Sequence, residues 1–554
     1  MSDEKHVYVS LDNDTDAELP PEKKGSIKER LGVVACILFT ELCERLTFYS
    51  IVANMVLFCT SKLHMTSDEA SNVSWVFSGT VYIIPVAGGY VADSFAGKYN
   101  TILGAGFIYT LGLVLVPASA MDFRGWFGDD TDLSLEARKI YFFLGLVFVA
   151  IGTGGIKANV GPFGAQQVND LGKDAVQSFF NWFYWFVNVG AIIAYSGVAT
   201  VQQNIGFDYG FLVPLISMVV ALVIFVIAKK KYKNNPPGGS VLSQSVRVCL
   251  QSCGKGCSFE NTRSDKGGSF NNEMVDGVMA VVRVLPVFVL IIVYWAVYSQ
   301  MSTSLFLQSE RMDIRVSGEP LPAALLNIFN TLIILILIPI MDRVVYPLLS
   351  KHGRSLTHLQ KMGIGMILAA LSMVYAGVLE IYRKKDGYFE QTLADDKFNA
   401  SYISMFAQVP EFALIGSSEV FTSISGLEFA YSQAPSFMQG LVMGLFLMTS
   451  GLGNYLSTLI VTIVKRATNN DWFPKEPNDG HLEYLLFLIA GLMILNLLVF
   501  MLVARWYTHK NPELVEMTPE VTNEKKDDED QVITDGYDNI GAVEILEQKE
   551  NTKL

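Results

Sequence analysis

Residues 33–58 read VVACILFTELCERLTFYSIVANMVLF, which is apolar for long enough to cross a membrane as a helix. Three charged side chains, Glu41, Glu44 and Arg45, nevertheless lie near its centre. Each charge at the middle of a bilayer costs about 2.5–3.5 kcal/mol on insertion scales, so three of them would destabilise a helix surrounded by lipid. We therefore expect a transmembrane helix whose charged side faces protein or water.

The composition of the whole chain also points to a membrane environment. Its 554 residues are 51% hydrophobic and only 17% charged, which is more apolar than a soluble protein of this length. Apolar runs of roughly 20 residues or more, the length that a helix needs to span the hydrocarbon, recur along the sequence. The predicted fold class is an all-α membrane protein with twelve spans, near residues 33–60, 72–94, 100–119, 140–160, 179–200, 211–228, 278–308, 321–347, 357–381, 403–429, 437–464 and 482–506.

Polar segments divide the spans into two sets of six. The segment after the sixth span is rich in Gly, Ser, Asn and Cys, as linkers are, and residues 241–250 have the pattern of a short amphipathic helix. Residues 511–554 hold 13 acidic and 4 basic side chains, so this tail should stay disordered. The predicted domains are an N-terminal tail (1–32), a six-helix bundle (33–228), a linker (229–277), a second six-helix bundle (278–508) and an acidic tail (509–554).

Lysine and arginine clusters predict the orientation. KKGSIKER (23–30) precedes the first span and KKKYK (229–233) follows the sixth, and basic flanks of this kind favour the cytosolic side. The margin is small, because RKK (383–385) and KR (465–466) fall on the opposite side. We expect both termini in the cytosol, with no cleavable signal peptide in residues 1–30.

The charges of the first span share one helical face. Glu41, Glu44 and Arg45 stand at positions i, i+3 and i+4, and Phe48 and Tyr49 extend the stripe by another turn. Carboxylates that exchange protons with water while an arginine balances their charge would form a proton relay. A static, purely structural ion pair is the alternative.

A second intramembrane cation occurs in the segment GTGGIKANVGPFGAQQV, residues 152–168. Its Lys157 lies within or beside the fourth span. The Gly-Lys-Ser/Thr order of a phosphate-binding loop is absent, so nucleotide binding is unsupported. The glycines more plausibly allow close helix packing.

Several segments resemble known transporters. GYVADSFAGKY (89–99) resembles the loop signature of the major facilitator superfamily, and ELCERLTFYS (41–50) resembles the Glu-x-x-Glu-Arg-Phe-x-Tyr-Tyr motif of the proton-coupled oligopeptide transporter family. Similarity to this family, and within it to the peptide/histidine branch of solute carrier family 15, extends through GTGGIKANVGPFGA (152–165), FFNWFYWFVNVGA (179–191), VYWAVYSQMSTSLFLQ (293–308), SSEVFTSISGLEFAYSQAPSFMQGL (417–441) and LGNYLST (452–458).

The resemblance implies the fold and a role for each matching residue. The fold is the major facilitator arrangement of two six-helix bundles with a substrate site between them. The residues implied in proton coupling are Glu41, Glu44, Arg45 and Lys157. Those implied in substrate binding are Arg45, Tyr49, Tyr82, Lys157, Asn188, Trp295, Asn330 and Glu419, where the glutamate would hold a peptide's amino terminus. The implied gating pair is Arg283 and Asp342.

The sequence also departs from the family pattern. Leu46 and Phe48 replace a phenylalanine and a tyrosine of the motif, and Val52 stands where many peptide carriers have another arginine. Trp75 and Ser299 replace the second-helix histidine and seventh-helix aspartate of intestinal-type carriers. We therefore expect Arg45 and Lys157 to bind the substrate carboxylate, and carboxylates instead of histidines to carry the proton.

The resemblance implies a proton-coupled symporter that moves di- and tripeptides, and free histidine, into the cytosol by alternating access. Protons are the coupling ion, and no other cofactor, metal, nucleic acid or enzymatic activity is expected. A nitrate or other small-anion proton symporter of the same fold is one alternative. A substrate-sensing scaffold at endolysosomal membranes is another.

Short signals bear on location and modification. YVSL (8–11) and YDNI (537–540) fit sorting signals for endosomes or lysosomes, whereas the terminal TKL could bind a PDZ domain at the plasma membrane. Asn399 begins a sequon for N-glycosylation. The linker trio Cys249, Cys253 and Cys257 is expected to carry free or acylated thiols, since a fourth zinc ligand is lacking.

Overall fold

The computed structural model describes residues 27–510, apart from residues 125–131, 172, 235, 238–240, 255–258, 317, 353–355, 394–395, 434, 436–437 and 475. The tail signals YVSL, YDNI and TKL, and the linker residue Cys257, lie outside the described residues. The five described cysteines are free thiols.

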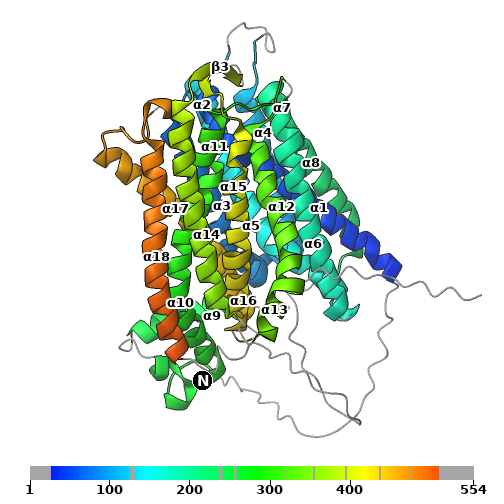
Figure 1. Cartoon of the computed structure of the whole chain (residues 1–554). Helices are drawn as coiled ribbons and strands as arrows, with labels where there is room; N and C mark the ends of the chain where they lie inside the picture. Colours follow the sequence, from blue (N-terminus) through cyan, green and yellow to red (C-terminus); the bar gives the residue numbers. More distant parts are fainter. Residues whose placement is uncertain are drawn as a thin grey trace, which may run out of the picture.

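Long helices dominate the described chain (Figure 1). The first half contains α1 (Ile27–Ala53), α2 (Met55–Ser61), α3 (Ser67–Val91), α4 (Lys98–Ala120), α5 (Leu135–Val168), α6 (Lys173–Ile193), α7 (Ala199–Asn204) and α8 (Phe207–Ile227). The expected linker helix is present as α9 (Val241–Gly254). The second half contains α10 (Asn272–Tyr298), α11 (Ser304–Glu310), α12 (Asn327–Ile340), α13 (Tyr346–Lys351), α14 (His358–Lys385), α15 (Val409–Glu419), α16 (Ser425–Ser432), α17 (Gln439–Ala467) and α18 (Leu482–Lys510).

Several helices are continued by π-helical turns, in which one extra residue per turn shifts the side chains that follow. These turns are η1 (Ala92–Ala96), η3 (Ala194–Val198), η9 (Met341–Val345) and η11 (Val420–Ile424). In the loop signature, η1 ends at Gly97, whose φ of 74° allows the chain to turn directly into α4.

Two small antiparallel hairpins complete the fold. One pairs β1 (Arg315–Val316) with β2 (Glu319–Pro320), and the other pairs β3 (Tyr388–Leu393) with β4 (Asp396–Ser401). The sequon residue Asn399 lies on β4, where it is exposed.

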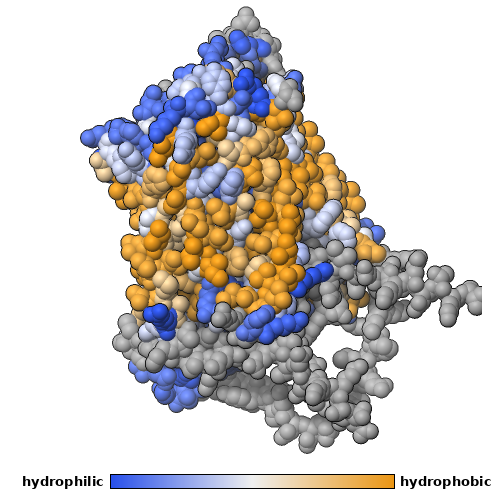
Figure 2. Space-filling view, viewed as in Figure 1, coloured by the Kyte–Doolittle hydropathy of each residue, from blue (hydrophilic) through white to orange (hydrophobic). Residues whose placement is uncertain are grey.

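The spans follow the predicted pattern. Among the described residues, ten helices are long and apolar enough to cross a membrane. The other two predicted spans correspond to α1, which carries the three charges, and to α15 with α16, which η11 joins. Figure 2 shows a broad hydrophobic band across the visible face of the bundle, with hydrophilic surfaces at its ends. The all-α membrane fold is therefore confirmed.

We call the end at which α1 begins and α18 ends the basal end, and the opposite end the distal end (Figure 1). Contacts between the halves gather at the distal end. Asp68 in the first turn of α3 forms an ion pair with Lys465 in the last turn of α17. Further along the same helices, Thr80 Oγ1 lies 2.8 Å from Tyr455 Oη. The structure is therefore closed at its distal end.

Glycines allow close helix packing, as expected for the segment around Lys157. A Cβ on Gly88 of α3 would lie 2.4 Å from the carbonyl oxygen of Gly154 on α5. A Cβ on Gly152 would lie 2.5 Å from Tyr109 Cβ on α4. Because no side chain fits in these contacts, the glycines set how closely α5 approaches α3 and α4.

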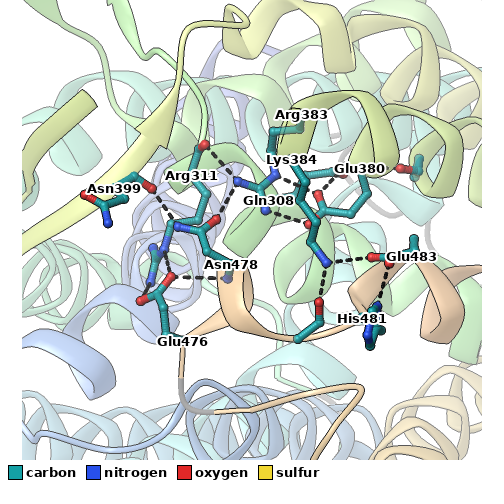
Figure 3. A network of polar contacts seen from close by, with 12 residues as sticks. Gln308, Arg311, Glu380, Arg383, Lys384, Asn399, Glu476, Asn478, His481 and Glu483 are labelled. Carbon is teal, nitrogen blue, oxygen red and sulfur yellow. Dashed lines mark hydrogen bonds and ion pairs between the residues drawn. The ribbon is translucent and has the colours of Figure 1, made fainter. Parts of the chain in front are cut away.

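A polar network stabilises the distal end of the second half (Figure 3). Arg383 Nη2 lies 2.6 Å from Glu380 Oε1, and the Glu380 Oε2 atom accepts a hydrogen bond of 3.0 Å from Gln308. The second guanidinium, that of Arg311, pairs with Glu476 at 2.8 Å. Arg311, Glu380 and Arg383 are buried, and their pairing and hydrogen bonds offset their loss of hydration and link α11, α14 and the segment before α18.

Candidate functional site

The charged side chains of α1 lie inside the protein, as expected. Glu41, Glu44 and Arg45 are 2%, 0% and 7% exposed. The Arg45 Nε atom lies 2.7 Å from Glu41 Oε1 and 2.7 Å from Glu44 Oε2. Glu41 Oε2 and Glu44 Oε1 are buried without a hydrogen-bond partner among the described residues. The acids therefore share one guanidinium and keep oxygen atoms that could take up a proton.

Lys157 of α5 lies beside this cluster, but it does not pair with the acids. Its Nζ atom is 4.0 Å from the centre of the Tyr82 ring and 4.5 Å from that of Phe48. Glu41 and Glu44 are close enough to interact with it electrostatically. With all groups ionised, the two acids and two cations balance, so protonation of either acid would leave an excess positive charge.

The second half of the bundle contributes a carboxylate. Glu419, at the end of α15, lies within hydrogen-bonding reach of Tyr298 on α10 and Asn330 on α12. Asn330 Nδ2 donates to Tyr298 Oη at 3.2 Å. Glu419 Oε2 and Asn330 Oδ1 are buried and unpartnered in the described part of the chain. The structure thus brings Asn330 and Glu419 together.

Aromatic side chains lie near both charged groups. Tyr49 and Tyr195 have ring centres 5.4 Å apart, and Glu419 is close enough to Tyr49, Tyr82 and Tyr195 to interact with them electrostatically. Arg45 is likewise close to Tyr49 and Tyr82, so these two rings lie near charges of both halves. Trp295 packs at 5.2 Å from Tyr298, and its buried Nε1 has no acceptor among the described residues.

Two aromatic residues of this region, Tyr195 and Tyr298, were missed by the sequence analysis. Tyr298 lies one helical turn after Trp295 in a segment already singled out, so helical spacing could have identified it. Tyr195 lies in the π-helical turn η3, where the altered periodicity breaks the link between spacing and direction.

Other implied residues have less clear positions. Asn188 on α6 is half-buried and donates to the carbonyl oxygen of Tyr184, one turn earlier. Arg283 is exposed on α10, and Asp342 lies in η9, but the side chain of Asp342 is outside the described part. The gating pair therefore stays a prediction.

The departures from the family pattern have structural counterparts. Trp75 Nε1 donates to the carbonyl oxygen of Ser299 at 3.2 Å, so the two replaced positions meet across the halves. Val52 belongs to the hydrophobic core and supplies no charge. The described binding region of the first half therefore presents Arg45 and Lys157 as its cations.

Comparisons with known proteins found similar sequences and similar structures. The family model PTR2, described as the POT family, matches residues 99–478. Protein NRT1/PTR FAMILY 8.2 of Arabidopsis thaliana is 35% identical over 92% of this chain and 99% of that protein. Solute carrier family 15 member 3 of Rattus norvegicus is 31% identical over 90% and 95%. The crystal structure of the POT family transporter PepTSo superposes with a TM-score of 0.70 and 26% identity, covering 86% of this chain and 98% of that one.

Proposed function

Because this chain belongs to the POT family, we propose that it is a proton-coupled symporter that carries di- and tripeptides, and free histidine, toward the cytosol. Family membership makes it a multi-pass membrane transporter with the predicted major facilitator fold. The solved structures that it resembles are also transporters and not enzymes. The finer statements, on substrate and coupling, rest on the site.

One observation carries the proposal: buried charges of opposite sign from the two halves lie near the same tyrosine rings, those of Tyr49 and Tyr82. Arg45 and Lys157 lie in the first half, and Glu419 lies in the second. A zwitterionic peptide presents a carboxylate and an ammonium several ångströms apart, so it fits lengthwise between these groups. The aromatic residues between them would accommodate varied side chains.

Proton coupling follows from competition for the cations. When both acids are ionised, they hold Arg45 at 2.7 Å each. Protonation of Glu41 or Glu44 removes one of these attractions, and Arg45 and Lys157 then become available to a substrate carboxylate. Loss of the proton restores the internal pairs and expels the substrate. Each pH unit of gradient supplies about 1.4 kcal/mol.

The cytosol is proposed to lie at the basal end. The basic clusters that argue against this orientation lie at the distal end, where Arg383, Lys384 and Lys465 are engaged in ion pairs with Glu380, Glu483 and Asp68. Their positions are thus explained by pairing within the protein. In this orientation the structure is closed toward the outside. We propose an endosomal, lysosomal or plasma membrane location.

An anion symporter is the second candidate, because relatives in Arabidopsis bear the name NRT1/PTR. A nitrate ion would need only the cations of the first half. Glu419, which a peptide's ammonium requires, would repel it. The geometry therefore favours the zwitterion. If the protein is instead a substrate-sensing scaffold, the substrate should bind at the same site but should not accumulate across the membrane.

Uptake into proteoliposomes tests the proposal. Purified protein should accumulate a labelled dipeptide or histidine only when an inward proton gradient is imposed, and excess nitrate should not compete. Accumulation without dependence on the gradient would contradict coupling. Binding without accumulation would favour the scaffold, and inhibition by nitrate would favour the anion symporter.

A further inference from the structure

Lys157 has an uncommon environment for a buried cation. In the described structure its Nζ atom is buried and has no hydrogen-bond partner. The faces of two aromatic rings occupy the position where an anion would be expected. The Nζ atom lies 4.0 Å from the centre of the Tyr82 ring and 4.5 Å from that of the Phe48 ring. Both distances fall within the range of cation–π attraction.

The neighbouring acids already pair with another cation, Arg45. Glu41 and Glu44 each hold an oxygen 2.7 Å from the same nitrogen of Arg45. An aromatic face offsets only part of the hydration that a buried ammonium loses, so Lys157 stays the cation with the most to gain from an incoming anion.

Phe48 is well placed to hold that ammonium and can do little else in the site. Its ring is 3% exposed and is supported by Phe77, with ring centres 6.3 Å apart, and by Tyr49 at 5.3 Å. A phenylalanine has no polar atom with which to hydrogen-bond a peptide. Its contribution to the chemistry of the site is therefore the face that it presents to Lys157.

We propose that Phe48 and Tyr82 form an aromatic clamp, a pair of ring faces that positions the Lys157 ammonium for the carboxylate of an incoming peptide. The clamp rests on the proposed function and deepens it. Both are positioning residues, and for Tyr82 the ring, not the hydroxyl, matters. The clamp makes the site selective for substrates with a free carboxylate, because only such a group repays withdrawal of the ammonium from the rings.

The test compares a labelled dipeptide with its carboxyl-terminal amide in gradient-driven uptake. Phe48→Leu removes the aromatic face but keeps an apolar side chain of similar size. We expect it to raise KM for the free dipeptide about five- to tenfold, equivalent to about 1–1.4 kcal/mol, with less than a twofold change in the maximal rate. For the amide, KM should not change. Phe48→Tyr, which keeps the ring, should restore the wild-type KM.

Tyr82 supplies an independent pair of variants, which also serves if Phe48→Leu fails to fold. Tyr82→Leu should raise KM for the free dipeptide alone, and Tyr82→Phe, which keeps the ring, should raise it less than Tyr82→Leu does. Phe107→Leu is the matched control, since Phe107 is 61% exposed on α4 and makes no cation–π contact with Lys157 in the described part of the chain. In a Lys157→Gln background, Phe48→Leu should add no further loss.

Several outcomes would overturn the clamp. An unchanged KM in Phe48→Leu and Tyr82→Leu would do so, as would equal losses for the dipeptide and its amide or an equal loss in Phe107→Leu. If the wild-type protein accumulates neither substrate, the proposed function fails and the clamp fails with it. If it accumulates the dipeptide while the leucine variants match it, the clamp alone fails.

Discussion

At the scale of single residues, the main feature of the site is that its charged groups lack some of their hydrogen-bond partners among the described residues. Glu44 is fully buried and shares Arg45 with Glu41, and neither of its oxygens has a hydrogen-bond partner in the described residues. A buried carboxylate held by a shared cation is less stable as an anion than one with its own partner. In the proposed cycle, the α1 acids take up and release the proton.

Glu44→Gln should separate binding from coupling. The amide is close in size to the acid but carries no exchangeable charge, so the variant should still exchange substrate across the membrane when no gradient is imposed. Accumulation driven by a proton gradient should fall at least about tenfold. Glu136→Gln is the control, because Glu136 lies at the exposed start of α5. A Glu44→Gln protein that accumulates substrate as the control does would contradict the relay.

Glu419→Gln should affect the amino terminus of the substrate. Removal of the carboxylate loses the attraction for an ammonium, so we expect KM for a free dipeptide to rise about tenfold or more. An N-acetylated dipeptide has no ammonium, and its weak uptake should be the same in both proteins. Competition assays with the two compounds measure the difference, and a loss of equal size for both would contradict this role.

At the scale of elements, the position of Lys157 depends on how closely α5 packs. Gly88 on α3 meets the backbone of Gly154, and Gly152 meets Tyr109 on α4, so the glycines around Lys157 leave no space for side chains. Close packing places the lysine beside α3, the helix that carries Tyr82.

Gly88→Ala should therefore destabilise the bundle. The new Cβ would lie 2.4 Å from the carbonyl oxygen of Gly154, and overpacking of this kind costs about 1–3 kcal/mol. We expect a lower apparent Tm in detergent and a higher KM, because α3 and α5 must move apart. Gly104→Ala on α4 is the matched control, since nothing lies within 4 Å of its Cβ. Equal Tm values for the two variants would contradict the packing argument.

At the scale of the whole molecule, the two halves are held together at the distal end. The Asp68 side chain is 4% exposed and pairs with Lys465, whose side chain is 33% exposed. Buried or partly buried pairs of this kind cost free energy when one partner is removed. The pair is expected to favour the state that is closed at the distal end.

Asp68→Asn should shift the protein toward a state open at the distal end. Distances between labels placed at the distal ends of α3 and α17 should lengthen in a larger fraction of molecules. The exchanged variant Asp68→Lys with Lys465→Asp should restore much of the wild-type distribution, because the pair is rebuilt. No change in Asp68→Asn, or no recovery in the exchanged protein, would show that other contacts hold this end closed.

The sequence alone determined that the chain lies in a membrane, where its twelve spans are and which face of α1 is charged. Span length, composition and the i, i+3, i+4 spacing are local properties, and they do not depend on how helices meet. Local chemistry also located the linker helix, which the structure describes as α9. The break of the tenth span at η11 was not predicted, because a π-helical turn changes neither length nor composition.

Only the tertiary structure decided which partner each charge has. The sequence placed Glu41, Glu44, Arg45 and Lys157 in one group, but the structure gives both acids to Arg45 and leaves Lys157 between Phe48 and Tyr82. These partners come from α1, α3 and α5, and the glycine contacts that bring α3 against α5 join residues far apart in sequence, such as Gly88 and Gly154. Pairing inside a membrane depends on which side chains the packed helices bring within a few ångströms, and no local pattern contains that information.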